Sequence, residues 1–257
     1  MRKKIVLVLG LMALIALLAG CSGMNQPIDE HTTGFWSHYF VYPLSWFIIT
    51  IADLFNGSFG VSIIITTLIV RLVLMPLMFK QVKSSKAMQD IQPEIKKLRE
   101  KYSSKDQKTQ RKLQEETMKL FSANKINPLA GCLPLIVQMP VLLAFYHAIS
   151  RTEAIKHQSF LWFNLGMPDH FYILPIVTGI TTFIQQKLML GKTGNANPQM
   201  AMMVYIFPIF IAGMAFAFPA ALALYWVVGN IFMIFQTYII YAEKKGSKES
   251  LSGGTKK

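Results

Sequence analysis

Acidic residues are scarce in this sequence, and the long hydrophobic stretches after residue 57 have none. The 257 residues include 13 Asp and Glu against 26 Lys and Arg, a formal net charge of +13, although 53% of the residues are hydrophobic. No Asp or Glu lies inside any long hydrophobic stretch after residue 57. Proton-coupled carriers and intramembrane aspartyl proteases use a carboxylate at membrane depth. The sequence therefore argues against both classes.

Patterns for disulfides, metal sites and phosphate loops are missing as well. Two cysteines, Cys21 and Cys132, do not make a disulfide framework. The five histidines have no ligand-type pairing with one another, and neither a Gly-rich phosphate loop nor a G-x-S-x-G turn occurs. We therefore predict a protein that is not an enzyme and that has no metal and no cofactor.

Basic residues are absent from some regions and concentrated in others. Residues 22–57 contain three acids and no Lys or Arg, whereas residues 80–125 contain 13 basic and six acidic residues. The end of the chain, from residue 242, is basic again. In membrane proteins such an alternation reports topology, because basic loops stay in the cytoplasm. We predict no direct specificity for nucleic acid.

One hydrophobic stretch carries a positive charge near its middle. Residues 60–80, GVSIIITTLIVRLVLMPLMFK, are long and apolar enough to cross a bilayer, and Arg71 lies among them. A guanidinium at that depth costs about 2.5–3.5 kcal/mol on insertion scales. Snorkelling toward Lys80 is one remedy, but the side chain has to cover roughly 13–14 Å of helix. We favour a water-filled cavity in which Arg71 meets an anion from another molecule.

The chain begins like a secreted protein. Residues 1–20 combine a basic start, an apolar run and small residues, which is typical of a signal peptide. The sequence Leu18-Ala19-Gly20-Cys21 resembles a bacterial lipobox, which implies cleavage before Cys21 and lipidation of its thiol. An uncleaved signal anchor is the alternative. Either way, the following residues are expected outside the cytoplasm.

The hydrophobic pattern predicts an all-α membrane protein with five transmembrane helices. The predicted spans are residues 60–80, 128–150, 172–190, 200–216 and 221–241. A helix from Pro43 to Phe55 is too short to span, at about 18–20 Å, and is expected in the outer interface. Asn56-Gly57-Ser58 should end it.

Four regions follow from this pattern. Residues 1–20 are the cleaved lipoprotein signal peptide, 21–57 an external segment with the interfacial helix, and 58–241 the five-span core. That core includes a cytoplasmic helical hairpin at 81–125. Residues 242–257 form a basic cytoplasmic tail that is expected to be disordered.

The basic hairpin is predicted from a seam of apolar residues at alternating spacings of three and four. The seam consists of Met88, Ile91, Ile95, Leu98 and Tyr102. Pro93 marks either a helix start or a kink. Ser104 and Gln107 fit a capping box for the second helix. The hairpin is either a solvated charged surface or a docking arm for lipid, ribosome or nascent chain, with its tip at Ser103, Ser104, Lys105 and Asp106.

Polar residues recur on the predicted spans. Trp226 and Asn230 share a helix face, Gln185 shares one with Thr178 and Thr181, and Gln138 lies among apolar neighbours. If these faces converge with Arg71, they line a polar groove made of Arg71, Gln138, Gln185, Trp226 and Asn230. Ordinary interhelical hydrogen bonding, or hydroxyls bonded to their own helix, is the alternative.

Several stretches together resemble the YidC membrane-protein insertase family, in its five-span SpoIIIJ form from Gram-positive bacteria. They are RLVLMPLMFK at 71–80, SSKAM at 84–88, QPEIKKLREKY at 92–102, NPLAGCLPLIVQMP at 127–140 and ALALYWVVGN at 221–230. The resemblance covers nearly the whole mature chain and rests on the combination. The large external domain of Gram-negative relatives is absent.

The resemblance implies an insertase that moves small membrane proteins from the cytoplasm into the bilayer, alone or beside the Sec translocon. Its groove would be closed toward the outside, and Arg71 would attract acidic residues in the client's outgoing tail. Nascent small membrane proteins, membrane lipids, the Sec translocon and the ribosome are the expected partners, and the plasma membrane the expected location. A channel or carrier with an Arg-lined path, and a passive scaffold, are the alternatives.

Overall fold

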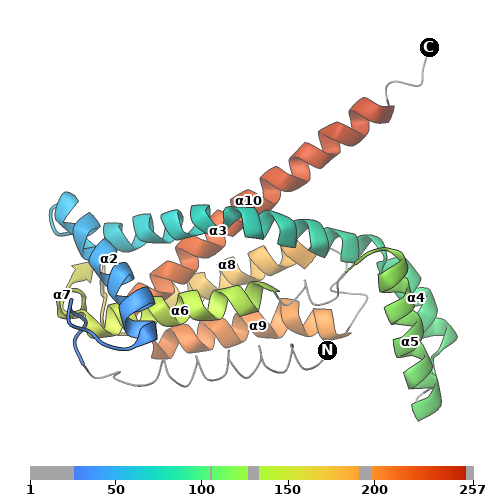
Figure 1. Ribbon diagram of the computed structural model, residues 1–257, viewed down its shortest axis with the longest axis horizontal. Coiled ribbons are helices and arrows are strands. Elements are labelled where there is room, and N and C mark those ends of the chain that lie inside the picture. Colours follow the sequence, from blue (N-terminus) through green and yellow to red (C-terminus); the bar gives the residue numbers. More distant parts are fainter. Residues whose placement is uncertain (1–25, 105, 127–132, 191–197, 253–257) are drawn as a thin grey trace.

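A computed structural model describes residues 26–104, 106–126, 133–190 and 198–252. Helices α3, α6, α8 and α9 run along one common direction (Figure 1). Helices α2 and α7 and a pair of strands gather at one end of this bundle, and α4 and α5 project from the other (Figure 1). The helices are η1 (Ser37–Val41), α2 (Tyr42–Leu54), α3 (Phe59–Asp90), α4 (Gln92–Lys101), α5 (Gln107–Ala123), α6 (Leu133–Arg151), α7 (Glu153–Lys156), α8 (Ile173–Leu190), α9 (Pro198–Ala217) and α10 (Ala220–Ser252).

The short helix expected between Pro43 and Phe55 is α2, which spans Tyr42–Leu54. Pro43 lies in its first turn, where a missing amide hydrogen costs no helical bond. The predicted break follows, because Asn56 and Gly57 both adopt positive φ, 53° and 78°. A short π-helix, η1, precedes α2 and was not predicted. The aromatic run before Pro43 therefore extends the helical segment toward the amino end.

The apolar core lies where α2 meets α3, α6 and the start of α10. Its fully buried side chains include Ile48, Phe145, Leu222 and Tyr225. Two polar contacts fix α2 on this core. The hydroxyls of Ser45 and Thr152 lie 2.6 Å apart, and the Ser62 hydroxyl of α3 donates to the Ile48 carbonyl. This end of the bundle is thus densely packed.

The structure is not entirely helical. Strands β1 (Ser159–Phe160) and β2 (Phe163–Asn164) pair antiparallel, with Phe160 opposite Phe163. The strand pair was not predicted from the sequence, and in the turn between the strands Leu161 has a φ of +54°. The Phe160 ring packs on Gly60, where a Cβ atom would lie 2.0 Å from the ring. The strand pair therefore covers the start of α3.

Helix α3 is longer than the predicted span. It runs from Phe59 through Pro76 to Asp90, so the first part of the predicted hairpin continues the span without a break. Helix α4 begins after Ile91 with Pro93 in its first turn, which decides between the two roles considered for that proline. Helices α4 and α5 pack on each other (Figure 1).

Two helices within the described residues are long and apolar enough to cross a membrane, namely Phe59–Asp90 and Ala220–Ile239, and Val204–Ala217 is a shorter apolar helix. The five-span arrangement stays a prediction. Helix α10 crosses α3 and continues beyond the bundle to Ser252, so the tail expected to be disordered is helical over most of its length (Figure 1). The signal peptide, Cys21 and Cys132 lie outside the described residues.

Candidate functional site

Arg71 lies in the middle of α3 and is buried. Only 7% of its surface is exposed. Within the described residues its guanidinium makes no ion pair and no hydrogen bond to another side chain or carbonyl. Its Cζ lies 5.8 Å from the ring centroid of Tyr225 on α10, within the range of a cation–π contact. The positive charge thus lies beside an aromatic face, and no carboxylate of the described residues pairs with it.

A glycine makes room for this guanidinium. A Cβ atom on Gly229 of α10 would lie 2.5 Å from Arg71 Nη2 and 3.0 Å from Nε. Gly229 follows Tyr225 by four residues, so both lie on one face of α10. Together the ring and the glycine backbone form the surface on which the Arg71 side chain rests. Neither Tyr225 nor Gly229 was predicted as a site residue from the sequence, although their four-residue spacing inside ALALYWVVGN places them on one helix face.

Gln138 joins this group from a third helix. Its amide nitrogen on α6 donates to the Tyr225 hydroxyl at 2.6 Å, and Tyr225 is only 1% exposed. Tyr225 therefore contacts Arg71 through its ring and Gln138 through its hydroxyl. The residues Arg71, Tyr225, Gly229 and Gln138 form a polar junction between α3, α10 and α6, which we call the Arg71 junction.

Asn230 and Trp226 face a different neighbour. The Asn230 amide donates to Thr182 Oγ1 at 2.8 Å and to Thr181 Oγ1 at 3.3 Å, which connects α10 to α8. Trp226 is buried in the apolar core, 6.5 Å from the ring of Phe218. Trp226 lies about 100° around the helix from Tyr225, and Asn230 about 140°. Among the described residues, neither side chain makes a hydrogen bond or a cation–π contact with Arg71.

Gln185 is also separate from the Arg71 junction. Its amide nitrogen lies 3.6 Å from the sulfur of Met189 on the same helix. The neighbouring hydroxyls of Thr181 and Thr182 bond to carbonyls of their own helix at 2.8 and 2.6 Å. The structure thus brings Gln138 to the Arg71 junction, whereas Asn230 belongs to the α8–α10 contact, Trp226 to the apolar core, and Gln185 to a contact within α8.

The hairpin tip is organised by Asp106. Its carboxylate accepts the Thr109 amide at 2.9 Å at the start of α5 and the Ser104 hydroxyl at 2.5 Å. The predicted capping box from Ser104 to Gln107 is therefore wrong, because the carboxylate caps the helix and Ser104 supports it. These hydrogen bonds, of which the one from Ser104 has the largest effect, hold the pKa of Asp106 well below its usual range. Ser103 and Ser104 are exposed, and Lys105 lies outside the described residues.

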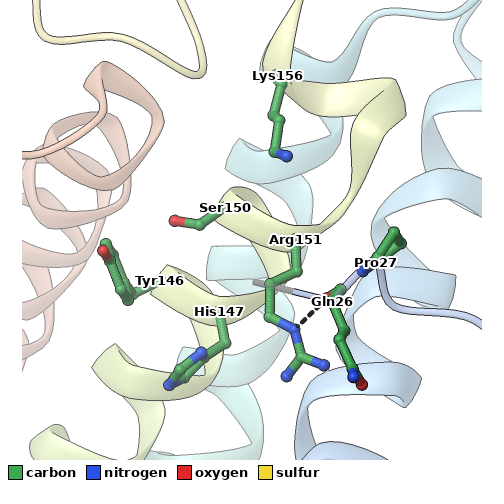
Figure 2. A pocket seen from close by; sticks show the side chains of 7 residues that line it. All are labelled: Gln26, Pro27, Tyr146, His147, Ser150, Arg151 and Lys156. Carbon is green, nitrogen blue, oxygen red and sulfur yellow. Dashed lines mark hydrogen bonds between the residues drawn. The ribbon is translucent and has the colours of Figure 1, made fainter. Parts of the chain in front are cut away.

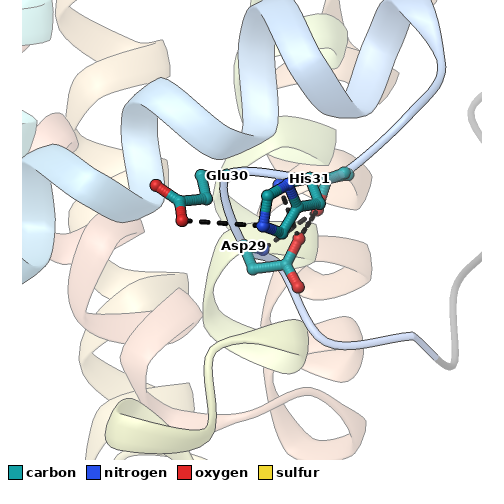
Figure 3. Close-up of polar contacts among 4 residues, drawn as sticks. Asp29, Glu30 and His31 are labelled. Atoms are coloured by element: carbon teal, nitrogen blue, oxygen red, sulfur yellow. Dashed lines mark hydrogen bonds and ion pairs between the residues drawn. The ribbon is translucent and has the colours of Figure 1, made fainter.

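Acidic and histidine side chains near the start of the described chain form a local turn. Asp29 Oδ1 accepts the His31 amide at 3.0 Å and the Thr32 hydroxyl at 3.1 Å, and His31 Nε2 lies 3.6 Å from Glu30 (Figure 3). The His31 and Glu30 side chains are 86% and 76% exposed. Among the described residues, no group of three or more His, Cys, Asp or Glu side chains could hold a metal ion. The hydrogen bonds of this cluster hold the backbone from Asp29 to Thr32 in a turn.

The sequence matches one protein family over most of its length. Residues 50–248 match the family described as the 60Kd inner membrane protein. The chain is 58% identical over 257 residues to the membrane protein insertase YidC 2 of Bacillus anthracis, covering all of both chains. It is 55% identical to the membrane protein insertase MisCA of Bacillus subtilis, covering all of this chain and 99% of the relative.

A solved structure is similar as well. A crystal structure of an active YidC insertase with its first transmembrane domain resolved matches with a TM-score of 0.61 and 27% identity. The match covers 80% of this chain and 47% of that one, so this chain spans about half of its length. Since the family match covers most of the chain and the relatives align from end to end, this chain belongs to the 60Kd inner membrane protein family, that of the YidC membrane protein insertases.

Proposed function

We propose that this chain is a membrane protein insertase, which moves short membrane proteins from the cytoplasm into the bilayer. The observation that carries the proposal is the burial of Arg71. Its guanidinium is only 7% exposed and lies in an apolar helix long enough to span a membrane. No carboxylate among the described residues pairs with it. A buried cation without a partner is costly unless another molecule supplies the opposite charge. The relatives named as membrane protein insertases suggest which molecule that is.

Arg71 attracts acidic residues in the client's outgoing tail and holds them at membrane depth. The membrane potential assists, because an acidic group moving outward gains about 2.3 kcal/mol per charge for each 100 mV. Apolar contacts then release the client helix sideways into lipid. Partitioning and the potential supply the driving force for insertion.

The proposed groove contains Arg71, Gln138, Gln185, Trp226 and Asn230. Support for Gln138 comes from its hydrogen bond to Tyr225, whose ring contacts Arg71. Support for Asn230 and Gln185 is weaker, since Asn230 bonds to threonines of α8 and Gln185 lies near Met189. In this proposal Arg71 contacts the client directly. The polar contact between α8 and α10 forms a separate part of the groove wall.

Five membrane spans, α3, α6, α8, α9 and α10, form the proposed core. Support comes from the exposed apolar side chains of α8, which recur every three or four residues as on a lipid-facing helix. They are Ile173, Ile176, Ile180, Ile184 and Leu188. Helix α2 lies in the outer interface with Trp46 and Leu54 exposed to lipid, and Ile48 and Ala52 toward the core.

The α4–α5 hairpin is proposed to lie in the cytoplasm and to recruit clients through its tip, beside the ribosome or the Sec translocon. The amino end is proposed to be processed before Cys21 and anchored by lipid on that thiol. The exposed Asp106 and Ser104 side chains at the tip, and the basic charge of residues 80–125, support the docking role.

Insertion of a labelled small client into liposomes that contain only this protein tests the function. The client carries an acidic outgoing tail, and its protected fragment after protease treatment measures insertion. We expect Arg71→Ala to lose insertion of this client. We expect Arg71→Lys to retain much of it, because attraction of the tail requires charge and no single hydrogen-bond geometry.

A client with a neutral tail serves as the control and should depend less on Arg71. Equal loss in Arg71→Ala and Arg71→Lys contradicts the charge mechanism. Full insertion by Arg71→Ala contradicts the role of Arg71 altogether and favours a passive scaffold.

A further inference from the structure

A pocket lies at the end of α6, outside the Arg71 junction. It has a volume of about 290 Å³ and is lined by polar and basic side chains (Figure 2). His147, Ser150 and Arg151 contribute from the last turn of α6, Lys156 from α7, and Gln26 from the segment before η1. None of its lining residues is acidic. The pocket is thus a basic hollow formed by three segments that are distant in sequence.

Arg151 is the second buried arginine of this protein, 4% exposed. Its Nε donates to the Gln26 carbonyl at 2.8 Å (Figure 2). Its Nη1 donates to Ser37 Oγ at 2.9 Å. Its Nη2 makes no hydrogen bond, and its guanidinium no ion pair, within the described part of the chain. The guanidinium is therefore held in place with donor capacity remaining, and no carboxylate among the residues that the structure describes pairs with it.

Lys156 adds a second positive charge. Its Nζ lies 2.6 Å from Glu153, whose side chain is 59% exposed and is not part of the pocket lining. This exposed pair is screened by solvent and leaves Lys156 two further donors. With Arg151, Lys156 and Glu153 counted together, the local charge is positive.

The neighbours of Arg151 indicate the depth of the pocket. Its partner Ser37 begins η1. Phe35, just before this helix, is 72% exposed, and Tyr39 and Phe40 within it are 64% and 45% exposed. Exposed aromatic rings in membrane proteins concentrate at the level of the lipid head groups. The pocket therefore opens at the depth at which lipid phosphates lie.

We propose that this pocket binds the phosphate of an anionic phospholipid of the outer leaflet, with Arg151 and Lys156 as the cationic partners and Ser150 as a hydroxyl donor. Arginine and lysine form short, charge-assisted hydrogen bonds with phosphate oxygens. Free phosphate shares this chemistry, but a site at head-group depth favours the lipid. The lipid neutralises Arg151 and holds the segment around Gln26 and Ser37 against α6. This inference rests on the proposed orientation, in which α2 lies in the outer interface, but it does not depend on client insertion by Arg71.

Native mass spectrometry of the full-length protein in detergent tests the assignment, with dioctanoyl-phosphatidylglycerol as the probe. Dioctanoyl-phosphatidylcholine and inorganic phosphate are the parallel arms. Lys156→Gln removes one charge, Ser150→Phe fills the pocket without changing charge, and Lys187→Gln removes an exposed charge at the far end of α8 as the matched control. Arg151 is left in place because it also holds Gln26 and Ser37, and the thermal midpoint of each variant is measured.

We expect the wild type to bind one phosphatidylglycerol and to bind phosphatidylcholine more weakly. The affinity for phosphatidylglycerol should fall about fivefold in Lys156→Gln and about tenfold or more in Ser150→Phe. Lys187→Gln should bind like the wild type. Equal binding by all variants overturns the proposal. Binding of inorganic phosphate that displaces the lipid at equal concentration overturns the lipid assignment. If Ser150→Phe fails to fold, Lys156→Gln against Lys187→Gln decides alone.

Discussion

Gly229 determines where the guanidinium of Arg71 can lie. A Cβ atom at this position meets Arg71 Nη2 at 2.5 Å, and the flexible end of the arginine side chain can move away from it. We expect Gly229→Ala to fold normally, since alanine favours a helix by about 1 kcal/mol over glycine. We also expect about fivefold slower insertion of an acidic-tailed client, as for weakening one interaction by about 1 kcal/mol. The liposome assay measures this.

Gly213 provides the matched control for Gly229. It lies in α9, and a Cβ atom there has no neighbour within 4 Å. Gly213→Ala should therefore insert clients like the wild type. Equal insertion by both variants contradicts the view that Gly229 positions the charge.

Asp106 caps α5 through its carboxylate. The bonds from Ser104 and Thr109 favour the charged form and lower its pKa. Because the folded pKa is depressed, the stabilisation is present above the unfolded value of about 3.9 and is lost as the pH falls below it. We expect the first turn of α5 to exchange its amide hydrogens faster at pH 3 than at pH 6, after correction for intrinsic rates.

Two substitutions separate the cap from the charge. Asp106→Ala should show the fast exchange of this turn already at pH 6, whereas Asp106→Asn, which can still accept the Thr109 amide, should stay close to the wild type. The exchange in Asp106→Asn should no longer depend on this pH step. Unchanged exchange in Asp106→Ala contradicts the capping role.

At the scale of elements, hydrophobic period and turn residues predicted where most helices lie. Helices α2, α8 and α9 begin and end within a few residues of the predicted segments. At α2 the reason is local, because Pro43, Asn56 and Gly57 restrict the backbone there. The strand pair and η1 were missed, since they depend on contacts with distant residues such as Gly60 and Arg151. Such tertiary contacts override local preference.

The polar residues were identified from the sequence more easily than their partners. Gln138 and Asn230 were singled out as amides among apolar residues, but which helix each one faces depends on rotation about the helix axis. Tyr225 lies next to Trp226 in sequence and faces α3 and α6, whereas Asn230 faces α8. A shift of one residue turns a side chain by about 100°, and periodicity alone does not fix which side meets which neighbour.

The hydrogen bond between Gln138 and Tyr225 holds α6 against α10. Tyr225→Phe keeps the ring beside Arg71 but leaves the Gln138 amide without its acceptor. We expect a loss of about 1 kcal/mol in stability, which lowers the thermal midpoint by roughly 2–4 °C. Insertion should be largely retained, since the aromatic face stays. Tyr225→Leu removes the ring as well and should lose both stability and insertion.

Tyr205 is the control for this change. It lies on α9 and is 48% exposed, so Tyr205→Phe removes a hydroxyl from the surface. Its thermal midpoint should equal that of the wild type. A midpoint for Tyr225→Phe that is also unchanged contradicts a structural role for the bond.

At the scale of the whole molecule, the distribution of basic residues along the chain matches the arrangement of the helices at the two ends of the bundle. The α4–α5 hairpin, in the strongly basic region, projects from one end of the bundle, and α2, α7 and the strands lie at the other end (Figure 1). Residues 26–57, which contain no Lys or Arg, belong to this second end (Figure 1). The positive-inside rule then predicts that the hairpin is cytoplasmic and the strand end external.

Cysteine labelling in intact cells tests this orientation. His157 beside α7 has a side chain that is 85% exposed, and Ser103 at the hairpin tip is exposed. In a Cys132→Ala background, a membrane-impermeant maleimide should label His157→Cys from outside and Ser103→Cys only after permeabilisation. The background chain alone measures any labelling of Cys21, which stays low if its thiol carries lipid. Labelling of Ser103→Cys in intact cells contradicts a cytoplasmic hairpin. A client arriving from the cytoplasm would then meet the strand end first, which also contradicts the proposed route of the client to Arg71.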